Sequence, residues 1–198
     1  MSGPRIDRLG DRDIDAVAGV IAEAFFHLAP AVWMFPDPLE RKRISPEYFR
    51  IFAEYGVAHG EAYGVGDKSG VAIWFRPAEE PPPLPADYDD RLDRICGEHA
   101  GRCRLFDAAL AAHHPHEPCH YLAFLAVLPG RQGAGLGGAL LADYHARLAE
   151  AGEPAHVEAS SIRARDLYLR HGYRPRGGAY HIVPDGPPLW PLWRDPRS

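Results

Sequence analysis

The chain has few cysteines and no long apolar run. It contains 3 cysteines in 198 residues, Cys96, Cys103 and Cys119, and an odd, sparse set does not make a disulfide framework. No stretch approaches the roughly 20 apolar residues that cross a bilayer, and residues 1–15 lack the apolar segment of a signal peptide. We therefore expect a cytoplasmic protein with reduced thiols and no membrane partner.

Positive charge is also scarce. Lysine and arginine total 22 against 27 acidic residues, a formal net charge of −5, so the basic footprint of a nucleic-acid-binding protein is missing. We expect no nucleic-acid partner. Because 46% of the residues are hydrophobic and the length suits a single core, we expect one domain over residues 1–198.

Apolar periodicity and turn residues predict a mixed α/β protein. Helices are expected over 11–26, 45–60, 90–114, 136–152 and 161–172, strands over 61–77 as a hairpin, 120–127, 155–160 and within 173–194, and proline-rich loops over 29–38 and 78–90. The early hairpin, followed later by a strand, a helix and a strand, predicts a mixed central sheet flanked by helices.

A glycine-rich segment joins one of these strands to the next helix. It reads "VLPGRQGAGLGG" over residues 127–138. The first N–H groups of a helix have no helical acceptor and lie at the positive end of its dipole. Glycines let an anion approach such a backbone closely, so the segment predicts a phosphate-binding site.

Two other glycine motifs fit this segment less well. A Walker loop needs Gly-Lys-Ser/Thr, and no lysine follows Lys68. A dinucleotide fingerprint is matched literally by Gly133, Gly135 and Gly138, but its first glycine should follow the strand directly. Here residues 128–132 intervene, and the remaining chain is too short for a doubly wound sheet. A nicotinamide-dependent reductase therefore remains a weak alternative.

The same segment resembles the pyrophosphate-binding motif of the GNAT superfamily of acetyl-CoA-dependent N-acetyltransferases. The motif, Gln/Arg-x-x-Gly-x-Gly/Ala, is matched by Gln132, Gly135 and Gly137, and "RDLYLRHGY" resembles a second signature through Tyr168 and Gly172. The C-terminal part of the chain is also similar to a narrower group, the puromycin N-acetyltransferases and their relatives. Together, in this order and at this separation, the motifs are far more specific than either alone.

This resemblance implies a GNAT fold, in which a bulged, splayed strand of the mixed sheet forms the acetyl-CoA cleft. The residues implied to bind acetyl-CoA are Leu125, Ala126, Val127, Gln132, Gly133, Ala134, Gly135, Leu136, Gly137 and Gly138. Backbone N–H groups near Leu125 to Val127 would also serve the oxyanion. Ala164 stands where many family members have an asparagine that helps to hold the cofactor.

The resemblance also implies residues for catalysis, because the attacking amine must lose a proton and the leaving thiolate must gain one. Tyr168 matches the family tyrosine and is expected to be the general acid, with simple aromatic packing as the other interpretation. The general base is left open between His120, at the start of the bulged strand, and Glu158, on the neighbouring strand.

The acceptor is expected to be a primary amine of a small molecule, such as an antibiotic-like amine. Phe25, Phe26 and Trp33 are implied to bind it, with core packing as the alternative, and Trp190 and Trp193 are candidates for the pocket wall or for a homodimer contact. A protein or peptide N-acetyltransferase and a non-catalytic CoA-binding sensor are the alternatives. Cys96, His99 and Cys103 lack the close pairing typical of zinc sites, so no metal is expected.

Overall fold

The computed structural model describes residues 3–78 and 84–196. Residues 79–83, which belong to the proline-rich loop predicted over 78–90, lie outside this described part. One mixed sheet has the strand order β1-β2-β3-β4-β5-β8-β6, and β7 pairs with β8. Its strands are β1 (Ile6–Arg8), β2 (Glu61–Val65), β3 (Gly70–Ala78), β4 (Cys119–Val127), β5 (Ala155–Ala159), β6 (Arg174–Pro175), β7 (Tyr180–His181) and β8 (Pro188–Arg194).

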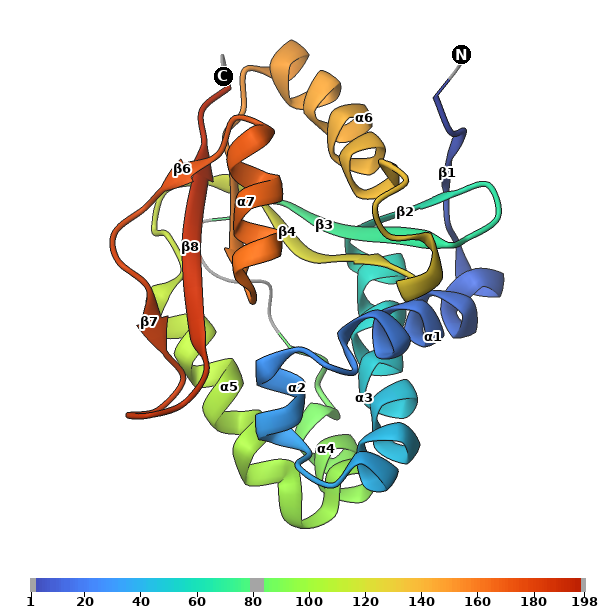
Figure 1. The fold of residues 1–198 in the computed structure, drawn as a ribbon, viewed down its shortest axis with the longest axis vertical. Helices are drawn as coiled ribbons and strands as arrows, with labels where there is room; N and C mark the ends of the chain where they lie inside the picture. Colours follow the sequence, from blue (N-terminus) through green and yellow to red (C-terminus); the bar gives the residue numbers. More distant parts are fainter. Residues whose placement is uncertain (1–2, 79–83, 197–198) are drawn as a thin grey trace.

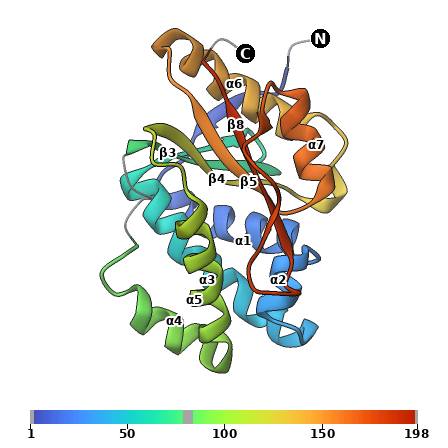
Figure 2. The same ribbon diagram turned by 90° about the vertical axis from the view of Figure 1, so that its left-hand side faces the viewer.

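Helices cover both faces of this sheet. They are α1 (Ile14–Phe25), α2 (Ala29–Met34), α3 (Pro38–His59), α4 (Tyr88–Cys96), α5 (Ala100–His113), α6 (Leu136–Ala151) and α7 (Ile162–Arg170). Figure 1 shows α1 to α5 in the lower half of the molecule and α6 and α7 in the upper half, and the turned view in Figure 2 agrees. The predicted mixed α/β architecture is confirmed.

The alternation of side chains along β3 divides the core between these two groups of helices. Val71 and Ile73 pack in a cluster with residues of α1, α3, α4 and α5. Ala72 and Trp74 point the other way, into a cluster with residues of α6, α7 and β5. The sheet is therefore buried on both faces, which explains the continuous apolar composition of its central strands.

Two predicted boundaries in the N-terminal half are wrong. The helix predicted from Ser45 begins earlier, as α3, because Oδ1 of Asp37 accepts the backbone N–H groups of Leu39 (2.8 Å) and Glu40 (2.9 Å) and Pro38 occupies the first helical turn. The segment predicted as a loop over 29–38 contains the short helix α2, since Pro30 also lies in a first turn, where its missing N–H costs nothing.

Strand β4 has an irregularity that opens the sheet. Its register with β3 pairs Phe124 with Ile73 and Leu122 with Trp74, so Ala123 is an extra residue, a β-bulge. On its other side β4 pairs in parallel with β5 only at His120–Ala155 and Tyr121–His156. Beyond these pairs the two strands separate, which confirms the predicted bulged, splayed strand.

Candidate active site

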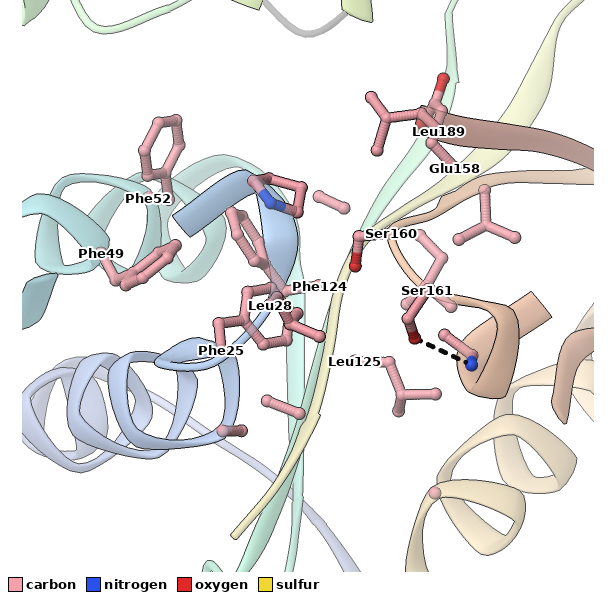
Figure 3. Close-up of a pocket in the computed structure, with 18 of the residues that line it drawn as sticks. Phe25, Leu28, Phe49, Phe52, Phe124, Leu125, Glu158, Ser160, Ser161 and Leu189 are labelled. Atoms are coloured by element: carbon pink, nitrogen blue, oxygen red, sulfur yellow. Dashed lines mark hydrogen bonds between the residues drawn. The ribbon is translucent and has the colours of Figure 1, made fainter. Parts of the chain in front are cut away.

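A cleft of about 600 Å³ lies where β4 and β5 separate. It is lined by the whole splayed part of β4, by Glu158 of β5, by the glycine-rich segment and by residues of α7. Its other walls come from α1, α2, α3 and α5. Figure 3 shows the aromatic side chains of α1 and α3 on one side of β4 and Ser160 and Ser161, before α7, on the other.

The glycine-rich segment forms one end of this lining. Gly133 (φ +83°) and Gly135 (φ +79°) adopt left-handed backbone conformations, which other residues rarely tolerate. Gly135 caps α6, whose first N–H groups have no helical acceptors. The Gln132 side chain donates from Nε2 to the carbonyl of Val127 (3.0 Å), tying the segment to the end of β4. A Cβ at Gly133 or Gly135 would meet no atom within 4 Å, so the space above them is open.

Gly138 is a glycine for a different reason. A Cβ there would lie 2.9 Å from Nε2 of His171, so this position is set by close packing against the residue that follows α7. At Gly137 a Cβ would make an ordinary 3.4 Å contact with Leu167. Within this segment, Gly133 and Gly135 are therefore the residues whose backbone conformation favours glycine. The need to let an anion approach the backbone does not explain every glycine of the segment.

Arginines supply positive charge to the cleft. Arg131, Arg163 and Arg170 all contribute to its lining, and Arg131 pairs with Asp67 at 3.0 Å. Guanidinium groups and helical N–H groups together complement a pyrophosphate. At the start of α7 the hydroxyl of Ser161 accepts a hydrogen bond from the backbone N–H of Ala164 (3.1 Å; Figure 3). Ala164, which stands where many family members have an asparagine, therefore takes part in the helix cap through its backbone.

Glu158, which lines the cleft, is paired with His156, which is buried behind the cleft wall. Nε2 of His156 lies 2.7 Å from Oε1 of Glu158, and the two side chains are 0% and 3% exposed. Nδ1 of His156 donates to the carbonyl of Leu192 (2.9 Å), because a carbonyl can only accept. The second carboxylate oxygen, Oε2, is buried and has no hydrogen-bond partner among the described residues.

Tyr168 lies beside this carboxylate. It lines the cleft and is 5% exposed. Burial, followed by the negative charge of Glu158, holds the pKa of the Tyr168 phenol well above its ordinary value. The same causes, in the same order, raise the pKa of Tyr121, which also lines the cleft. Tyr168 thus stays protonated at neutral pH, as a proton donor must.

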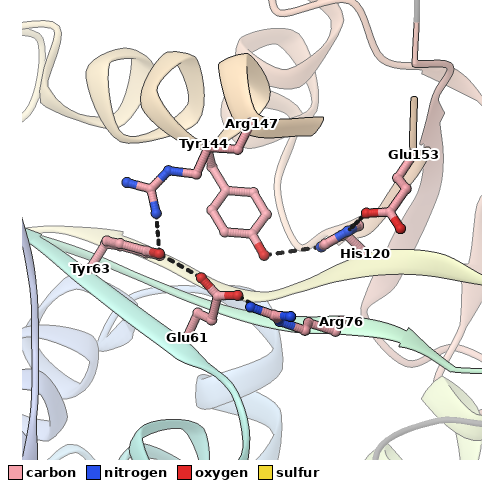
Figure 4. A network of polar contacts seen from close by, with 7 residues as sticks. All are labelled: Glu61, Tyr63, Arg76, His120, Tyr144, Arg147 and Glu153. Carbon is pink, nitrogen blue, oxygen red and sulfur yellow. Dashed lines mark hydrogen bonds and ion pairs between the residues drawn. The ribbon is translucent and has the colours of Figure 1, made fainter. Parts of the chain in front are cut away.

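The structure does not bring His120 to the cleft. Its Nδ1 lies 3.0 Å from the hydroxyl of Tyr144 and its Nε2 lies 2.6 Å from Glu153 (Figure 4). The reason is its place on β4: His120 is paired with Ala155, where β4 and β5 have not yet separated, and its side chain lies under α6 (Figure 4). Both ring nitrogens are occupied, and we remove His120 from the candidate bases.

A polar network surrounds His120 on that face (Figure 4). Glu61 accepts hydrogen bonds from the Tyr63 hydroxyl (2.5 Å) and from Arg76 (2.9 Å), and Arg147 donates to Tyr63. Burial alone would raise the pKa of Glu61, but the hydrogen bonds from Tyr63 and Arg76, with the positive charge of Arg76, hold it below its ordinary value. These groups satisfy one another between the sheet and α6 and leave no polar group directed at the cleft.

The aromatic wall differs from the predicted one. Phe25 lines the cleft as predicted, whereas Phe26 and Trp33 do not. The ring of Phe26 lies 4.6 Å from the Arg41 guanidinium, and that of Trp33 lies 5.7 Å from the Arg102 guanidinium. The other aromatic residues of the lining are Tyr48, Phe49, Phe52, Tyr55, Phe75, Phe106, Tyr121, Phe124 and Tyr168.

Sequence reasoning missed three polar residues of the site. His156 was detectable, since residues two apart on a strand share a face and Glu158 was already a candidate. Asp107 and His114 line the cleft from α5, and no local pattern connects that helix with β5. The ring of His114 lies 5.6 Å from that of His156, and burial lowers its pKa.

Two groups among the described residues could hold a metal ion. His114, His156 and Glu158 offer ligand atoms within 4.8 Å of one another, and so do Glu40, Glu98 and His99. Neither group contains a cysteine, and Cys96, Cys103 and Cys119 are buried free thiols. The expectation that the reaction uses no metal stays a prediction.

Comparison with known proteins places this geometry in a family. Residues 88–175, from α4 to β6, match the acetyltransferase (GNAT) domain. A structure from Corynebacterium glutamicum, described as histone acetyltransferase HPA2 and related acetyltransferase, is 26% identical, with a TM-score of 0.76 over 98% of this chain and 97% of that one. Among the described residues, no helix is both long and apolar enough to cross a bilayer.

More distant structures share the fold. The polyamine N-acetyltransferase of Drosophila melanogaster is 13% identical, with a TM-score of 0.65 over 98% of this chain and 100% of that one. The ribosomal-protein-S18-alanine N-acetyltransferase of Escherichia coli is 18% identical, with a TM-score of 0.55 over 98% and 94%.

The splayed sheet, the glycine segment and these matches define an acyltransferase of the acetyl-CoA-dependent class. The chain carries a GNAT acetyltransferase domain in a GNAT fold, and it is an N-acetyltransferase.

Proposed function

We propose that this chain transfers an acetyl group from acetyl-CoA to the primary amine of a small molecule with an apolar or aromatic body, of which an antibiotic-like amine is one example. The observation that carries the proposal is the cleft itself, in which the carboxylate of Glu158 and the phenol of Tyr168 face the same cavity as the aromatic wall. Neighbouring structures include an agmatine N-acetyltransferase and an arylalkylamine N-acetyltransferase from Aedes aegypti, whose names support a small amine.

The cofactor half of the cleft is formed by β4 and the start of α6. Acetyl-CoA brings the reactive thioester. Gln132, Gly133, Ala134, Gly135, Leu136, Gly137 and Gly138 are proposed to hold its pyrophosphate, through the free N–H groups before and within the first turn of α6. Leu125, Ala126 and Val127 line the cleft on the open edge of β4, where their backbone groups are proposed to align the acyl group and stabilise the oxyanion.

Glu158 and Tyr168 are proposed to move the protons. Oε2 of Glu158, the oxygen without a partner, accepts a proton from the incoming ammonium group. The amine nitrogen then forms a bond to the acyl carbon as the carbon–sulfur bond breaks, and the second proton that this nitrogen loses on becoming an amide returns through solvent to the Tyr168 oxygen. The phenol of Tyr168 protonates the departing thiolate, which its raised pKa allows because the phenol is still protonated when the sulfur leaves. His156 acts through Glu158 as a positioning residue.

The experiment that tests this function measures release of free CoA thiol from acetyl-CoA with a panel of arylalkylamines, together with the mass of the acetylated amine. We expect turnover with small amines and little with basic peptides. Turnover with peptides alone would favour the protein N-acetyltransferase. If acetyl-CoA raised the melting temperature but no amine or peptide released thiol, the chain would be a CoA-binding sensor. The cytoplasmic location and a homodimer through Trp190 and Trp193 remain predictions.

A further inference from the structure

One face of α5 forms part of the cleft wall. Asp107, Leu110 and Ala111 of α5 line the cavity together with His114, the residue that follows the helix. The spacing of three and four residues places the first three on one side of the helix, and His114 continues this side at its end. At one end of this face, the His114 ring lies close to His156, the partner of Glu158. Asp107 lies seven residues earlier, which corresponds to about 10 Å along the helix axis.

Asp107 is a half-buried carboxylate without a cation. Its Oδ2 accepts a hydrogen bond from the hydroxyl of Tyr88 (2.6 Å), and its Oδ1 receives none from the described residues. The nearest arginine in sequence, Arg104, is bound instead to Asp89 (2.8 Å) and Asp93 (2.9 Å). Within residues 3–78 and 84–196 no ion pair to Asp107 is present.

The remaining lining near this part of α5 is apolar. Tyr48, Phe52 and Phe106 contribute aromatic rings to the same cavity. Removing a carboxylate from water is costly unless it is paired, and aromatic faces also attract cations. A positively charged group that entered the cleft would therefore find both a counter-ion and aromatic surface at Asp107.

We propose that Asp107 binds a second cationic group of the acceptor. Because the ligand atoms of His114 and Glu158 lie within 4.8 Å of each other, the helix rise of about 10 Å from Asp107 to His114 sets the scale of the separation. The acceptor is then an elongated molecule with an apolar middle and two nitrogens on the order of 10 Å apart. This inference rests on the proposed function, because Glu158 is taken to receive the nitrogen that is acetylated. It makes Asp107 a specificity-determining residue on α5, a helix that contains neither the glycine-rich motif nor the Tyr168 signature.

The first test compares amines that differ only in the second nitrogen. Diaminooctane spans the required distance, octylamine lacks the second charge, and diaminobutane is too short. At pH 8 we expect kcat/KM for diaminooctane to exceed that for octylamine by about tenfold, the order of a single well-placed charge pair. Diaminobutane should show no such advantage over butylamine.

The variant Asp107→Asn separates recognition from folding. An amide oxygen still accepts the Tyr88 hydrogen bond, so the packing of α4 on α5 is retained. We expect the diamine preference to disappear through a higher KM for diaminooctane, with kcat and octylamine turnover nearly unchanged. An unaltered preference in this variant would overturn the proposal, and so would an equal preference for the short diamine.

A direct binding measurement distinguishes failure of the Asp107 site from failure of the proposed acetyltransferase function. Calorimetric titration of diaminooctane into the wild-type chain and into Asp107→Asn requires no turnover. If diaminooctane binds the wild type more tightly than the variant while no amine is acetylated, the Asp107 site stands and the proposed function fails. If amines are acetylated but both proteins bind diaminooctane equally, the function stands and the second-cation site is wrong.

A pH profile gives an independent readout. Burial raises the pKa of Asp107 to about 6, although the Tyr88 hydrogen bond opposes this. The other titratable groups facing it are Asp89 of α4, Tyr48 of α3 and Cys103 and Arg104 of α5. Both alkyl ammonium groups stay charged below pH 8. The ratio of diamine to monoamine kcat/KM should therefore fall as the pH decreases through about 6, and in Tyr88→Phe it should begin to fall at a higher pH.

Discussion

Nε2 of His156 lies 2.7 Å from Oε1 of Glu158, and the two residues lie on the same face of β5, two positions apart. The other nitrogen of His156 is bonded to the carbonyl of Leu192 on β8. The imidazole therefore has one orientation, and it holds the carboxylate in one orientation too. Oε2 of Glu158 has no hydrogen-bond partner within residues 3–78 and 84–196, and Glu158 lines the cleft, so we propose this oxygen as the proton acceptor of the reaction.

Replacing Glu158 by Gln removes this acceptor and retains the shape of the side chain. We expect kcat/KM for the amine to fall by about 10²–10⁴-fold, the usual contribution of a general base, while the KM for acetyl-CoA stays nearly constant. Glu153→Gln is the matched control, since Glu153 binds His120 on the opposite face of the sheet. Steady-state kinetics check both variants, and a similar loss in the control would show that His120 had been set aside wrongly.

The Tyr168→Phe variant tests the general acid. Loss of the hydroxyl should reduce kcat by about 10²–10⁴-fold, and acetyl-CoA binding should change little. Tyr173→Phe is the control, because Tyr173 is buried nearby but its hydroxyl lies 3.2 Å from His145 and does not line the cleft. Unchanged turnover in Tyr168→Phe would reduce this residue to a packing role against Tyr173, whose ring centre is 5.6 Å away.

The variant Gly135→Ala tests whether the left-handed backbone conformation in the glycine-rich segment matters for acetyl-CoA binding. The φ of +79° at this residue means that Gly135→Ala strains the chain by about 1–2 kcal/mol. We expect a lower melting temperature and weaker acetyl-CoA binding, both measurable by thermal unfolding with and without the cosubstrate. Gly130→Ala should affect neither, because Gly130 has no positive φ and open space around its Cβ position.

The stability of the fold should decrease in mild acid. Burial lowers the pKa of His145 from 6.5 to about 3, so the folded chain binds fewer protons at this ring than the unfolded chain between these values. The contribution of the neutral His145 ring to the free energy of unfolding is complete above pH 6.5. Between pH 6.5 and about 3 it decreases by about 1.4 kcal/mol for each pH unit. Denaturant unfolding between pH 7.5 and pH 4.5 should show a shallower decline for His145→Gln than for the wild type.

Much of the cofactor half of the site could be predicted from local sequence. The strand, the glycine segment and the helix after it are contiguous, and the left-handed conformations at Gly133 and Gly135 require glycine wherever they occur. Tyr168 lies on a short helix that was predicted over 161–172 and is capped by Ser161. The chain order of these parts is enough to place them around one cleft once the fold is that of a GNAT enzyme.

The acceptor half was predicted less well, because it is assembled from distant segments. Phe26 and Trp33 are adjacent in sequence to residues that line the cleft, but each turns toward an arginine of another helix. The bulge at Ala123 places Phe124 on the face that packs against α1 and α3, opposite to the face of Leu122. A change of one residue in register exchanges the two faces of a strand, and hydrophobic pattern alone does not reveal it.

By itself, then, the sequence determined the properties that depend on neighbouring residues: the glycine turn at 133–138, the helix of Tyr168 and the class of chemistry that these motifs imply. Only the tertiary structure decided which of the two candidate bases lines the cleft, because His120 and Glu158 lie on strands whose orientation is set by long-range pairing. It also decided that α5 brings Asp107 into the cleft. Side-chain direction on a strand or helix follows from what that element packs against, and those partners are far away in the chain.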